Sequence, residues 1–387
     1  MISPSEAYRL ILHNAKIFPV EIIPLEKAIG RVLREDIQSD RDQPPFNKSL
    51  MDGIAIASDS WQKGLRTYLV EAVVPPGTAP KPLKNVSNCV RIMTGAVIPK
   101  GCDSVIPVEQ LHLEGDTALI KDWTMIKKNQ FIRFQGADGK KGEVLLKSGC
   151  RLWAPHIGIA ASVGKVKIKV SAIPKIAVIA TGDELVDIHK PIKQYQTRLS
   201  NSYALLALIT QAQLGEVQIF HLHDNQKLML QTIKKILGKF DVLILSGGVS
   251  TGEYDYVPGV LAQLGIKQIF HKVSQKPGKP FWFGMSKRGM PVFALPGNPV
   301  STQICAYRYV VPYLKKASGL EVKQEYIAIK DKINIQSDLT QFLPVSGARL
   351  IPIGGSGDFA SLALADGFIE YESHKNQNLW PYFSWRV

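Results

Sequence analysis

The sequence predicts a multidomain protein in which a central α/β domain is combined with β-rich segments. Between residues 176 and 301, short apolar runs rich in β-branched residues alternate with stretches whose apolar residues recur at helical spacing. This alternation is typical of a mainly parallel sheet covered by helices. Outside that region, short strand-like runs are separated by proline and glycine turns, and a chain of 387 residues exceeds what a single core usually fills.

The N-terminal segment is predicted to begin with an amphipathic helix over residues 4–13. Ser3 stands at the N-cap position and Glu6 completes a capping box, in which each side chain bonds the other residue's backbone N–H. A second helical stretch is predicted near residues 25–33. Two consecutive prolines then break any helix, so we expect a boundary at residue 45.

Composition and patterning divide the rest of the chain into four regions. In chain order these are a β-rich domain at 46–138, a mixed segment at 139–172, an α/β unit at 173–318 and a C-terminal β domain at 319–387. The elements predicted in the second and fourth regions are the helix 153–161 and the strands 166–170, 326–329 and 350–353.

The α/β unit contains five predicted strands and three predicted helices. The strands are residues 176–180, 217–220, 242–245, 269–273 and 292–295, and the helices are residues 203–213, 226–237 and 256–264. In open α/β sheets, ligands bind in the crevice outside the carboxyl ends of the strands. The residues that follow each strand are therefore candidates for a binding site.

Acidic, basic and glycine-rich residues gather at these strand ends. The candidate residues are Thr181, Gly182, Glu184, Asp224, Ser246, Gly247, Gly248, Ser250, Asp255, Lys276, Lys279, Pro296, Asn298 and Ser301. Carboxylates bind hard divalent cations, whereas lysine ammonium groups and exposed backbone N–H groups bind anions. This combination predicts an anionic substrate that is handled together with a divalent cation.

The glycine-rich loop at residues 246–252 follows a strand and precedes a helix, which lets backbone N–H groups approach a phosphate. Its spacing is neither Gly-x-Gly-x-x-Gly nor Gly-x-x-x-x-Gly-Lys-Ser/Thr, which argues against a nicotinamide dehydrogenase and a P-loop ATPase. A plain tight turn would explain the glycines alone, but it would not explain Glu253 and Asp255 beside them. A solvated basic loop is the alternative for the two lysines, and simple helix capping is the alternative for Ser301.

Two histidines near a strand end suggest a metal site, because His221 and His223 would share one face of the strand. Two imidazoles and one acid are too few ligands for a closed site, so packed or surface histidines are favoured and Asp224 is the better candidate. The Ser-Asn-Ser segment at residues 200–202 precedes an apolar helical run, and we interpret it as a helix cap.

The formal net charge of +14 favours work on phosphates or other anions, but the basic residues are scattered and do not interleave with aromatic residues. Nucleic-acid binding is therefore not expected. Four cysteines lie far apart without a Cys-x-x-Cys pair, so neither a zinc site nor a disulfide framework is indicated. No secretion signal is visible, and no apolar run approaches the roughly 20 residues of a membrane span. We expect a cytoplasmic protein without membrane contact.

Nine segments, in order along almost the whole chain, carry a resemblance to a known family. They are residues 49–53, 91–96, 136–138, 181–185, 246–255, 276–280, 295–301, 355–357 and 364–367. Together these motifs closely resemble the molybdopterin molybdenumtransferase family, which includes the C-terminal region of gephyrin.

The resemblance implies a homodimer whose subunits each have four domains. By that pattern, residues 1–45 and 139–172 form an extended domain, 46–138 a β-rich inserted domain, 173–318 a three-layer α/β/α molybdopterin-binding domain and 319–387 a β-barrel-like domain. It also implies an enzyme that inserts molybdate into adenylylated molybdopterin, giving molybdenum cofactor and AMP with the help of a divalent cation. Magnesium is the first choice of cation, zinc and manganese are alternatives, and the molybdopterin adenylyltransferase is a candidate partner for substrate handover.

By position, five acids match the family's cleft, and three further residues match its substrate and oxyanion contacts. The acids are Asp52, Asp138, Glu184, Asp224 and Asp255, and the contacts are Lys276, Lys279 and Ser356. Glu184, Asp224 and Asp255 are expected to hold the cation or the pterin end, and residues 246–251 are expected to hold the nucleotide phosphate. The lysines are expected to hold the pterin phosphate or molybdate. A dimer would bring Asp52 and Asp138 of the neighbouring subunit to the carboxyl ends of these strands.

One segment departs from the family pattern. The family usually has Asp-Asn-Ser-Ala-Met-Asp-Gly-Tyr-Ala where this chain has Asn47 and Lys48 in the first two positions. The change bears on local metal affinity or substrate preference, and it is expected either to tune an active enzyme or to mark a paralogue that binds without turnover. Two other functions are considered, a non-catalytic scaffold and a nucleotide hydrolase that uses the loop at 246–252. A scaffold would need an added interaction segment or a long linker, and the chain shows neither.

Overall fold

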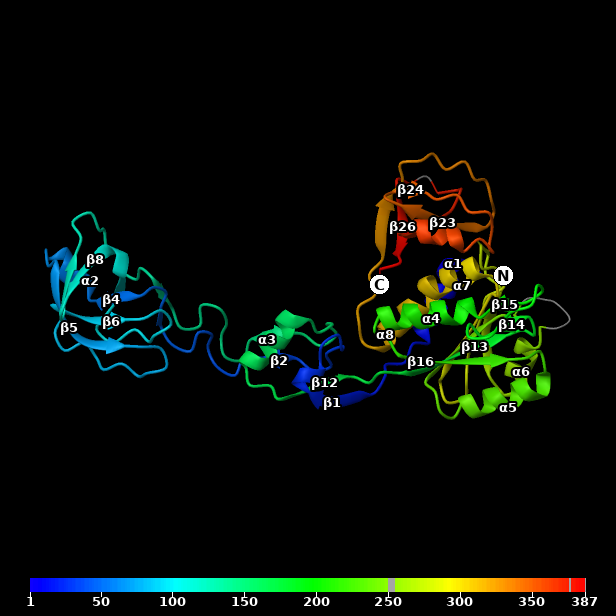
Figure 1. Ribbon diagram of the computed structural model, residues 1–387, viewed down its shortest axis with the longest axis horizontal. Coiled ribbons are helices and arrows are strands. Elements are labelled where there is room, and N and C mark those ends of the chain that lie inside the picture. Colours follow the sequence, from blue (N-terminus) through cyan, green and yellow to red (C-terminus); the bar gives the residue numbers. More distant parts are fainter. Residues whose placement is uncertain (250–254, 376, 387) are drawn as a thin grey trace. The chain divides into compact units, whose positions relative to one another are not determined.

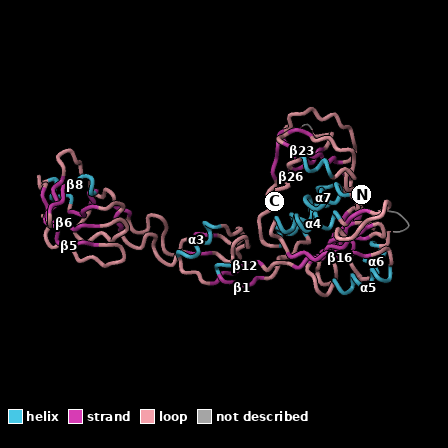
Figure 2. The backbone as a smooth tube through the Cα atoms, viewed as in Figure 1, coloured by secondary structure: helices cyan, strands magenta, loops and turns pink. Residues whose placement is uncertain are grey.

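The computed structural model describes residues 1–249, 255–375 and 377–386 and divides into two compact units (Figure 1). Unit 1 consists of Met1–Glu35, Ser148–Ala154 and Lys167–Val387, and unit 2 consists of Asp36–Lys147 and Pro155–Val166. The chain therefore leaves unit 1 and returns to it twice. Both units combine strands, helices and long connecting loops (Figure 2).

The central sheet of unit 1 has six strands in the order β16-β13-β17-β21-β20-β18. Their bounds are β13 Lys175–Thr181, β16 Glu216–Leu222, β17 Val242–Ser246, β18 Lys267–His271, β20 Trp282–Met285 and β21 Pro291–Leu295. The first four strands in the sheet order run parallel, and β20 is antiparallel to both of its neighbours. Because β20 reverses direction, β18 points the same way as β21. The five predicted strands and their mainly parallel arrangement are confirmed, although the fourth strand ends at His271 rather than at residue 273.

Strand β20 was not predicted from the sequence. It is only four residues long, it follows Pro280, and it contains Gly284, and both residue types usually mark loops. The structure shows why a glycine stands here. A Cβ atom at Gly284 would lie 2.6 Å from the carbonyl oxygen of Lys267 on β18, so the close approach of the two strands requires a residue without a side chain.

Helices cover both faces of the central sheet. Their bounds are α1 Pro4–His13, α4 Ser200–Gln211, α5 Gln226–Ile236, α6 Val257–Gln263, α7 Pro299–Cys305 and α8 Val311–Ala317, with a π-helical turn Ala306–Val310 between the last two. Alternate residues of β13 supply the two cores. Ile176 packs in a cluster that includes residues of α1, α4, α7 and α8, whereas Ala177 packs in a cluster that includes residues of α5 and α6. Helix, sheet and helix thus form three layers.

A second six-stranded sheet in unit 1 is formed mainly by the C-terminal region, in the order β19-β23-β25-β26-β22 with β24 paired to β23. The bounds are β19 Gln275–Lys276, β22 Glu325–Ala328, β23 Thr340–Ser346, β24 Arg349–Leu350, β25 Gly367–Tyr371 and β26 Leu379–Ser384, and a 3₁₀ turn spans Ala360–Leu364. The strand predicted at 350–353 is therefore wrong beyond residue 350. The sheet also recruits β19, which precedes β20 in the chain.

The second helix predicted near residues 25–33 is wrong, because only a 3₁₀ turn, Leu25–Lys27, is present. Gly30 adopts a φ of +76°, which ends a right-handed helix, and Val32 then forms a bridge with Arg151. The preceding segment forms β1, Val20–Pro24, which pairs with β12, Lys167–Ser171.

Unit 2 is built around a six-stranded sheet in the order β7-β4-β6-β5-β9-β8. Its strands are β4 Gly53–Ile56, β5 Thr67–Val74, β6 Asn88–Ile92, β7 Ser104–Pro107, β8 Leu111–Glu114 and β9 Thr117–Ile120. Smaller elements are β2 Ile37–Gln38, β3 Lys48–Ser49, β10 Ile132–Arg133, β11 Val144–Leu146, α2 Ser58–Gln62, a 3₁₀ turn Val108–Gln110 and α3 Ala154–Ser162, whose first residue belongs to unit 1.

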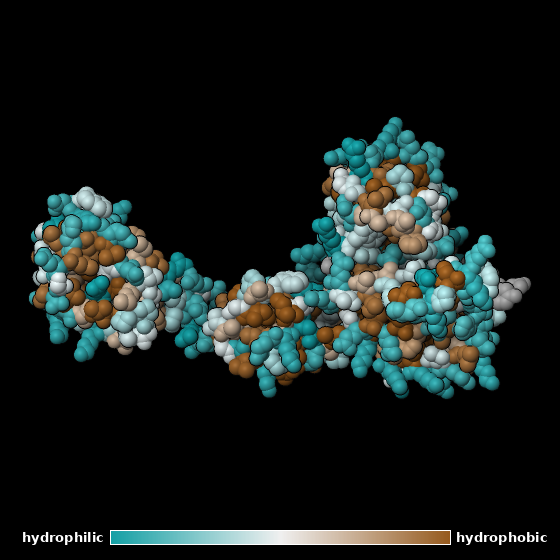
Figure 3. Space-filling model, viewed as in Figure 1, coloured by the Kyte–Doolittle hydropathy of each residue, from teal (hydrophilic) through white to brown (hydrophobic). Residues whose placement is uncertain are grey.

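The surfaces of both units are mostly hydrophilic, with apolar patches between charged side chains (Figure 3). Among the described residues, none of the helices has the length and apolar character that crossing a membrane would require.

Candidate functional site

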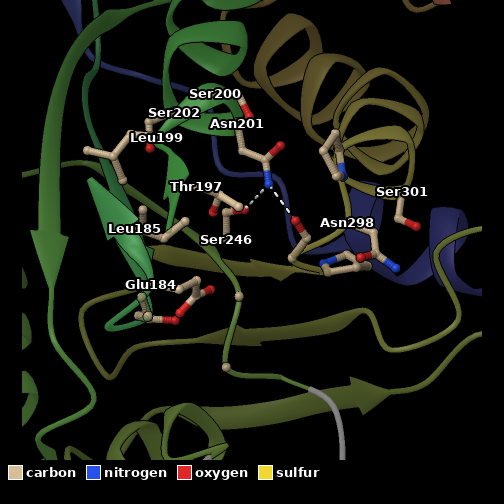
Figure 4. A pocket seen from close by; sticks show the side chains of 18 of the residues that line it. Glu184, Leu185, Thr197, Leu199, Ser200, Asn201, Ser202, Ser246, Asn298 and Ser301 are labelled. Atoms are coloured by element: carbon tan, nitrogen blue, oxygen red, sulfur yellow. Dashed lines mark hydrogen bonds between the residues drawn. The ribbon is translucent and has the colours of Figure 1, made fainter. Parts of the chain in front are cut away.

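A cavity of about 950 Å³ opens in unit 1, beside the carboxyl ends of β13, β17 and β21 (Figure 4). Most of the predicted strand-end residues line it: Thr181, Gly182, Glu184, Asp224, Ser246, Gly247, Gly248, Asp255, Pro296, Asn298 and Ser301. Ser250 and Glu253 lie outside the described residues. The short paired strands β14, Leu185–Val186, and β15, Thr197–Arg198, add to the wall.

The glycine turn after β17 has a geometry that side chains would not permit. Gly247 and Gly248 have φ values of +98° and +67°. A Cβ atom on Gly247 would lie 2.9 Å from the carbonyl oxygen of Thr181, and one on Gly248 would lie 2.8 Å from Cγ2 of Val257. Glycine is therefore required for the turn to lie against β13 and α6.

The hydroxyl of Thr181 lies at the same turn. Its Oγ1 atom is 3.0 Å from the Cβ positions built on Gly247 and on Gly248, so it faces the glycine turn. The residue is only 4% exposed, and its hydroxyl has no hydrogen-bond partner within the described part of the chain. A buried hydroxyl without a partner is costly, and this one lies beneath the glycine turn at the cavity that Thr181 lines.

Asn201 is a cavity residue that the sequence reasoning missed. The cap predicted at residues 200–202 is wrong, because α4 starts at Ser200 after an N-cap residue, Leu199, whose side chain makes no capping bond. The Asn201 Nδ2 atom instead donates to Ser246 Oγ at 3.0 Å and to the Gly297 carbonyl oxygen at 2.7 Å (Figure 4). These partners lie 45 and 96 residues away in the chain, so no local signal could have revealed them.

Two histidines at the carboxyl end of β16 bond the loop that follows β13. His221 Nε2 donates to the Gly182 carbonyl oxygen at 2.9 Å, and His223 Nδ1 donates to Asp183 Oδ1 at 2.8 Å. The Asp183 carboxylate also accepts the backbone N–H of Asp224 at 3.2 Å. These hydrogen bonds, that of His223 first, lower the pKa of Asp183.

The pKa of Asp224 is raised, first because the carboxyl is partly buried and then because Asp183, Glu184 and Asp255 place further negative charge nearby. Among the described residues, no group of three or more histidine, cysteine or acidic side chains is arranged to hold a metal ion by itself. A magnesium ion usually takes one or two carboxylates, water and substrate phosphate oxygens rather than an all-protein cage. The donor set, which consists of carboxylates crowded at one wall, fits that kind of site.

The predicted lysines do not line the cavity. Lys276 and Lys279 are exposed and flank a loop between β19 and β20, next to Pro280, which does line the cavity. Gly278 in this loop has a φ of +98°, and a Cβ atom there would lie 2.6 Å from Nε2 of the fully buried Gln275. The same Nε2 atom donates to the Gly278 carbonyl oxygen at 3.2 Å, so Gln275 supports the loop from beneath.

The C-terminal region contributes to the site through Ser356. Asn298 Nδ2 donates to Ser356 Oγ at 2.8 Å, and the N–H of Val300 donates to the Ser356 carbonyl oxygen at 3.1 Å. Helix α7 begins at Pro299, as predicted for a proline at the first helical position. Gly357 and Phe359 of the same segment line the cavity.

The remaining two predicted acids lie in unit 2. Asp52 Oδ1 accepts from the Thr94 N–H at 2.6 Å and from the Thr94 hydroxyl at 2.8 Å, and these bonds lower the pKa of Asp52. Asp138 forms an ion pair with Arg133, and this bond, supported by the charge of Lys48, lowers its pKa.

Both departures from the family pattern lie at this part of unit 2. Asn47 Oδ1 accepts the backbone N–H of Gln135 at 2.8 Å. Lys48 lies near enough to Asp138 for its charge to stabilise the carboxylate. The substituted residues therefore act on the segment that carries Asp138.

Comparison with known proteins assigns the class. Residues 2–164 match a family model described as the MoeA N-terminal region, domains I and II, and residues 177–316 match one described as a probable molybdopterin binding domain. The second match covers the three-layer domain that carries the cavity. The fold and the cavity thus define a multidomain protein built around a domain of that type.

Full-length relatives identify the family. The chain is 34% identical over 399 residues to a molybdopterin molybdenumtransferase from Synechocystis sp., covering 100% of both chains, and 33% identical over 371 residues to one from Nostoc sp., covering 93% and 82%. A crystal structure of the molybdopterin biosynthesis MoeA protein from Pyrococcus horikosii matches with a TM-score of 0.86 at 30% identity, covering 100% of both chains. The chain belongs to the molybdopterin molybdenumtransferase family.

Proposed function

We propose that this protein is a transferase that inserts molybdate into adenylylated molybdopterin, giving molybdenum cofactor with release of AMP. The observation that carries the proposal is the cavity at the carboxyl ends of β13, β17 and β21. A glycine turn, the hydroxyls of Thr181 and Ser246, and several carboxylates line this cavity. A substrate that joins two groups through a pyrophosphate needs such donors for its phosphate oxygens. The full-length relatives named molybdopterin molybdenumtransferase support the same reaction.

The residues of the cavity divide the work of binding. Ser246, with the Gly247–Gly248 turn and the Thr181 hydroxyl beside it, would hold the nucleotide phosphate. Lys276 and Lys279, whose loop adjoins the cavity through Pro280, would hold the pterin phosphate or molybdate as point charges. Closely spaced donors of this kind stabilise charge on the departing AMP because they are already oriented before the reaction.

One or two of the carboxylates Glu184, Asp224 and Asp255 would hold a divalent cation together with phosphate oxygens of the substrate, with Mg²⁺ favoured over Zn²⁺ or Mn²⁺. The bound cation supplies positive charge that neutralises the phosphate groups. Without it, the negative charge of these carboxylates would oppose binding of an anionic substrate.

The domain layout and assembly follow the same proposal. The extended domain takes residues 1–45 and 139–172, the β-rich inserted domain 46–138, the α/β domain 173–318 and the β-barrel-like domain 319–387. In a homodimer, Asp52 and Asp138 of one subunit would approach the cavity of the other. The adenylylated substrate would be handed over by the molybdopterin adenylyltransferase.

Turnover of purified protein tests the proposal. With adenylylated molybdopterin, Mg²⁺ and molybdate, we expect AMP release that depends on molybdate and is lost in the variant Asp255→Asn. Glu216→Gln is the matched control, because Glu216 is exposed and begins β16, at the end of the sheet away from the cavity. Release of AMP without molybdate would indicate a nucleotide hydrolase, and binding without release would indicate a scaffold. Either result would overturn the transferase proposal.

A further inference from the structure

The hydrogen-bond partners of Asn201 identify which atom of its side-chain amide is the nitrogen and which is the oxygen. A backbone carbonyl oxygen can only accept, so the atom 2.7 Å from the Gly297 oxygen must be the NH₂ group of Asn201. The same nitrogen lies 3.0 Å from Ser246 Oγ. Both hydrogens of the amide are thereby assigned, one to each partner, and the orientation of the side chain follows from geometry alone.

This assignment determines the role of the Ser246 hydroxyl. An amide NH₂ group only donates, so Ser246 Oγ accepts from Asn201 and its own hydrogen remains available for donation elsewhere. Ser246 is 3% exposed and is the last residue of β17, and it lines the cavity together with Asn201. A hydroxyl that is held as an acceptor on one side is a donor towards the other, which suits an anionic oxygen.

Asn201 also joins two turns that line the cavity. Gly247 follows β17 and Gly297 follows β21, and a Cβ atom on Gly297 would lie 3.6 Å from Cα of Gly247. The N–H of Gly247 donates to the Leu295 carbonyl oxygen at 3.1 Å, so the two turns already touch. By bonding Ser246 on one turn and Gly297 on the other, Asn201 fixes their separation from the side of α4.

We propose that Asn201 is a positioning residue that commits the Ser246 hydroxyl to donate a hydrogen bond to an anionic phosphate oxygen of the bound nucleotide. The inference rests on the proposed function for the identity of that nucleotide. It assigns no chemical step to Asn201, which acts on the nucleotide through the Ser246 hydroxyl.

A double-mutant cycle tests this coupling. The variants are Asn201→Ala, Ser246→Ala and the two combined, and the probe is AMP in the presence of Mg²⁺, titrated by calorimetry. A hydrogen bond to a charged group corresponds to roughly tenfold to a hundredfold in affinity, so we expect each single variant to weaken AMP binding by about that factor. Because Asn201 acts through Ser246, the double variant should bind within about twofold of Ser246→Ala.

Two further variants separate positioning from general structural damage. Asn201→Asp keeps the shape but replaces the donor with a carboxylate, and it should weaken AMP binding at least as much as Asn201→Ala. Asn14→Ala removes an amide that donates to the Leu10 carbonyl oxygen at 2.8 Å, outside the cavity, and should leave AMP binding unchanged. Thermal unfolding of every variant shows whether it is folded, and in turnover the KM should rise more than kcat falls.

The outcomes are distinguishable from a failure of the proposed function. If Asn201→Ala weakens binding equally in the presence and absence of Ser246, the two residues are independent and the inference is overturned. Absence of AMP binding to the unaltered protein would overturn it as well. A protein that shows the predicted coupling for AMP but no molybdate-dependent AMP release would leave the inference standing and remove the transferase proposal.

Discussion

Arg308 and Glu370 form a buried ion pair that joins the π-helical turn to β25 of the C-terminal sheet. The Nε and Oε2 atoms are 2.7 Å apart, and the two side chains are 6% and 7% exposed. The guanidinium also lies over the ring of Tyr8 on α1, 4.3 Å from its centroid. Because removal of one partner leaves a buried charge unpaired, Glu370→Gln should lower the free energy of unfolding by about 3–5 kcal/mol in urea titrations.

Two comparisons check the cause of that loss. The double variant Arg308→Met with Glu370→Leu removes both charges and should recover most of the stability, because an apolar pair needs no desolvation. Glu321→Gln, which breaks an ion pair with Lys323 whose side chains are 75% and 76% exposed, should change stability by less than about 1 kcal/mol. Equal losses from Glu370→Gln and Glu321→Gln would contradict this account.

Substitution at the glycine turn should impair binding beyond its effect on stability. Gly248→Ala adds a left-handed strain of about 1–2 kcal/mol and also a Cβ atom 2.8 Å from Val257. Gly347→Ala is the control, because Gly347 has a φ of +52° but nothing within 4 Å of its added Cβ. We expect both variants to lose stability in denaturant, but only Gly248→Ala to lose AMP affinity. Unchanged AMP affinity in Gly248→Ala would show that the turn does not contact the nucleotide.

The raised pKa of Asp224 predicts a conflict between stability and activity. An acid whose folded pKa lies above its unfolded pKa stabilises the protein fully at pH values below the unfolded value, 3.8, and loses that contribution as the pH rises through the folded pKa. At neutral pH the ionised carboxyl therefore destabilises the fold. Asp224→Asn should raise the free energy of unfolding at pH 7 and abolish molybdate-dependent AMP release.

Measurement of unfolding from pH 4 to 8 with and without Mg²⁺ checks this prediction. The stability difference between Asp224→Asn and the unaltered protein should grow as the pH rises, and Mg²⁺ should reduce it, because a bound cation favours the carboxylate. A variant that is less stable at neutral pH would contradict the assigned sign. Asp241→Asn is the control, because it removes a carboxylate that accepts the Lys175 N–H far from the cavity. The stability difference between this variant and the unaltered protein should not depend on Mg²⁺.

The buried residues Gln275 and Tyr309, which support the loop between Lys276 and Lys279, should affect substrate binding. The Tyr309 hydroxyl donates to Gln275 Oε1, whose amide nitrogen in turn bonds the loop at Gly278. Tyr309→Phe keeps the stacked contact with Phe281 but leaves the buried Oε1 without its donor, at a cost of about 1–3 kcal/mol. We expect the KM for adenylylated molybdopterin to rise because Lys276 and Lys279 lose their fixed loop.

Tyr68→Phe is the control for that experiment. It removes a buried hydroxyl that bonds Ser60 Oγ at 2.9 Å in unit 2, so it should lose comparable stability without changing the KM. A rise in KM in both variants, or in neither, would show that the loop does not depend on the Gln275 support.

Local patterns in the sequence were sufficient where the structure depends on local chemistry. The strands β13, β17 and β21 are continuous apolar runs, and every residue of β17 and β21 is buried. The N-cap bond from the Glu6 N–H to Ser3 Oγ, at 3.1 Å, was predicted from residues three apart, whereas the Glu6 carboxylate accepts from Arg9 instead of completing the capping box. The rule that ligands bind beyond the carboxyl ends of parallel strands then located the cavity.

Patterns failed where a distant partner overrides local preference. A Ser-Asn-Ser segment before an apolar helix looks like a cap, but Asn201 bonds Ser246 and Gly297 because the sheet brings β17 and β21 beneath α4. The helix predicted near residues 25–33 is absent because Val32 instead forms a β-bridge with Arg151, which lies far along the chain.

The sequence by itself determined the order of five strands and three helices in the α/β unit and the residue types available at its strand ends, because hydrophobic periodicity and turn residues act over a few positions. Only the tertiary structure decided which of those residues share one cavity, since parallel pairing aligns segments that are tens of residues apart. It also decided that Lys276 and Lys279 lie on a loop that Gln275 supports, and that Asn201 bonds both Ser246 and Gly297 at the cavity. These relationships depend on long-range packing, which no local pattern encodes.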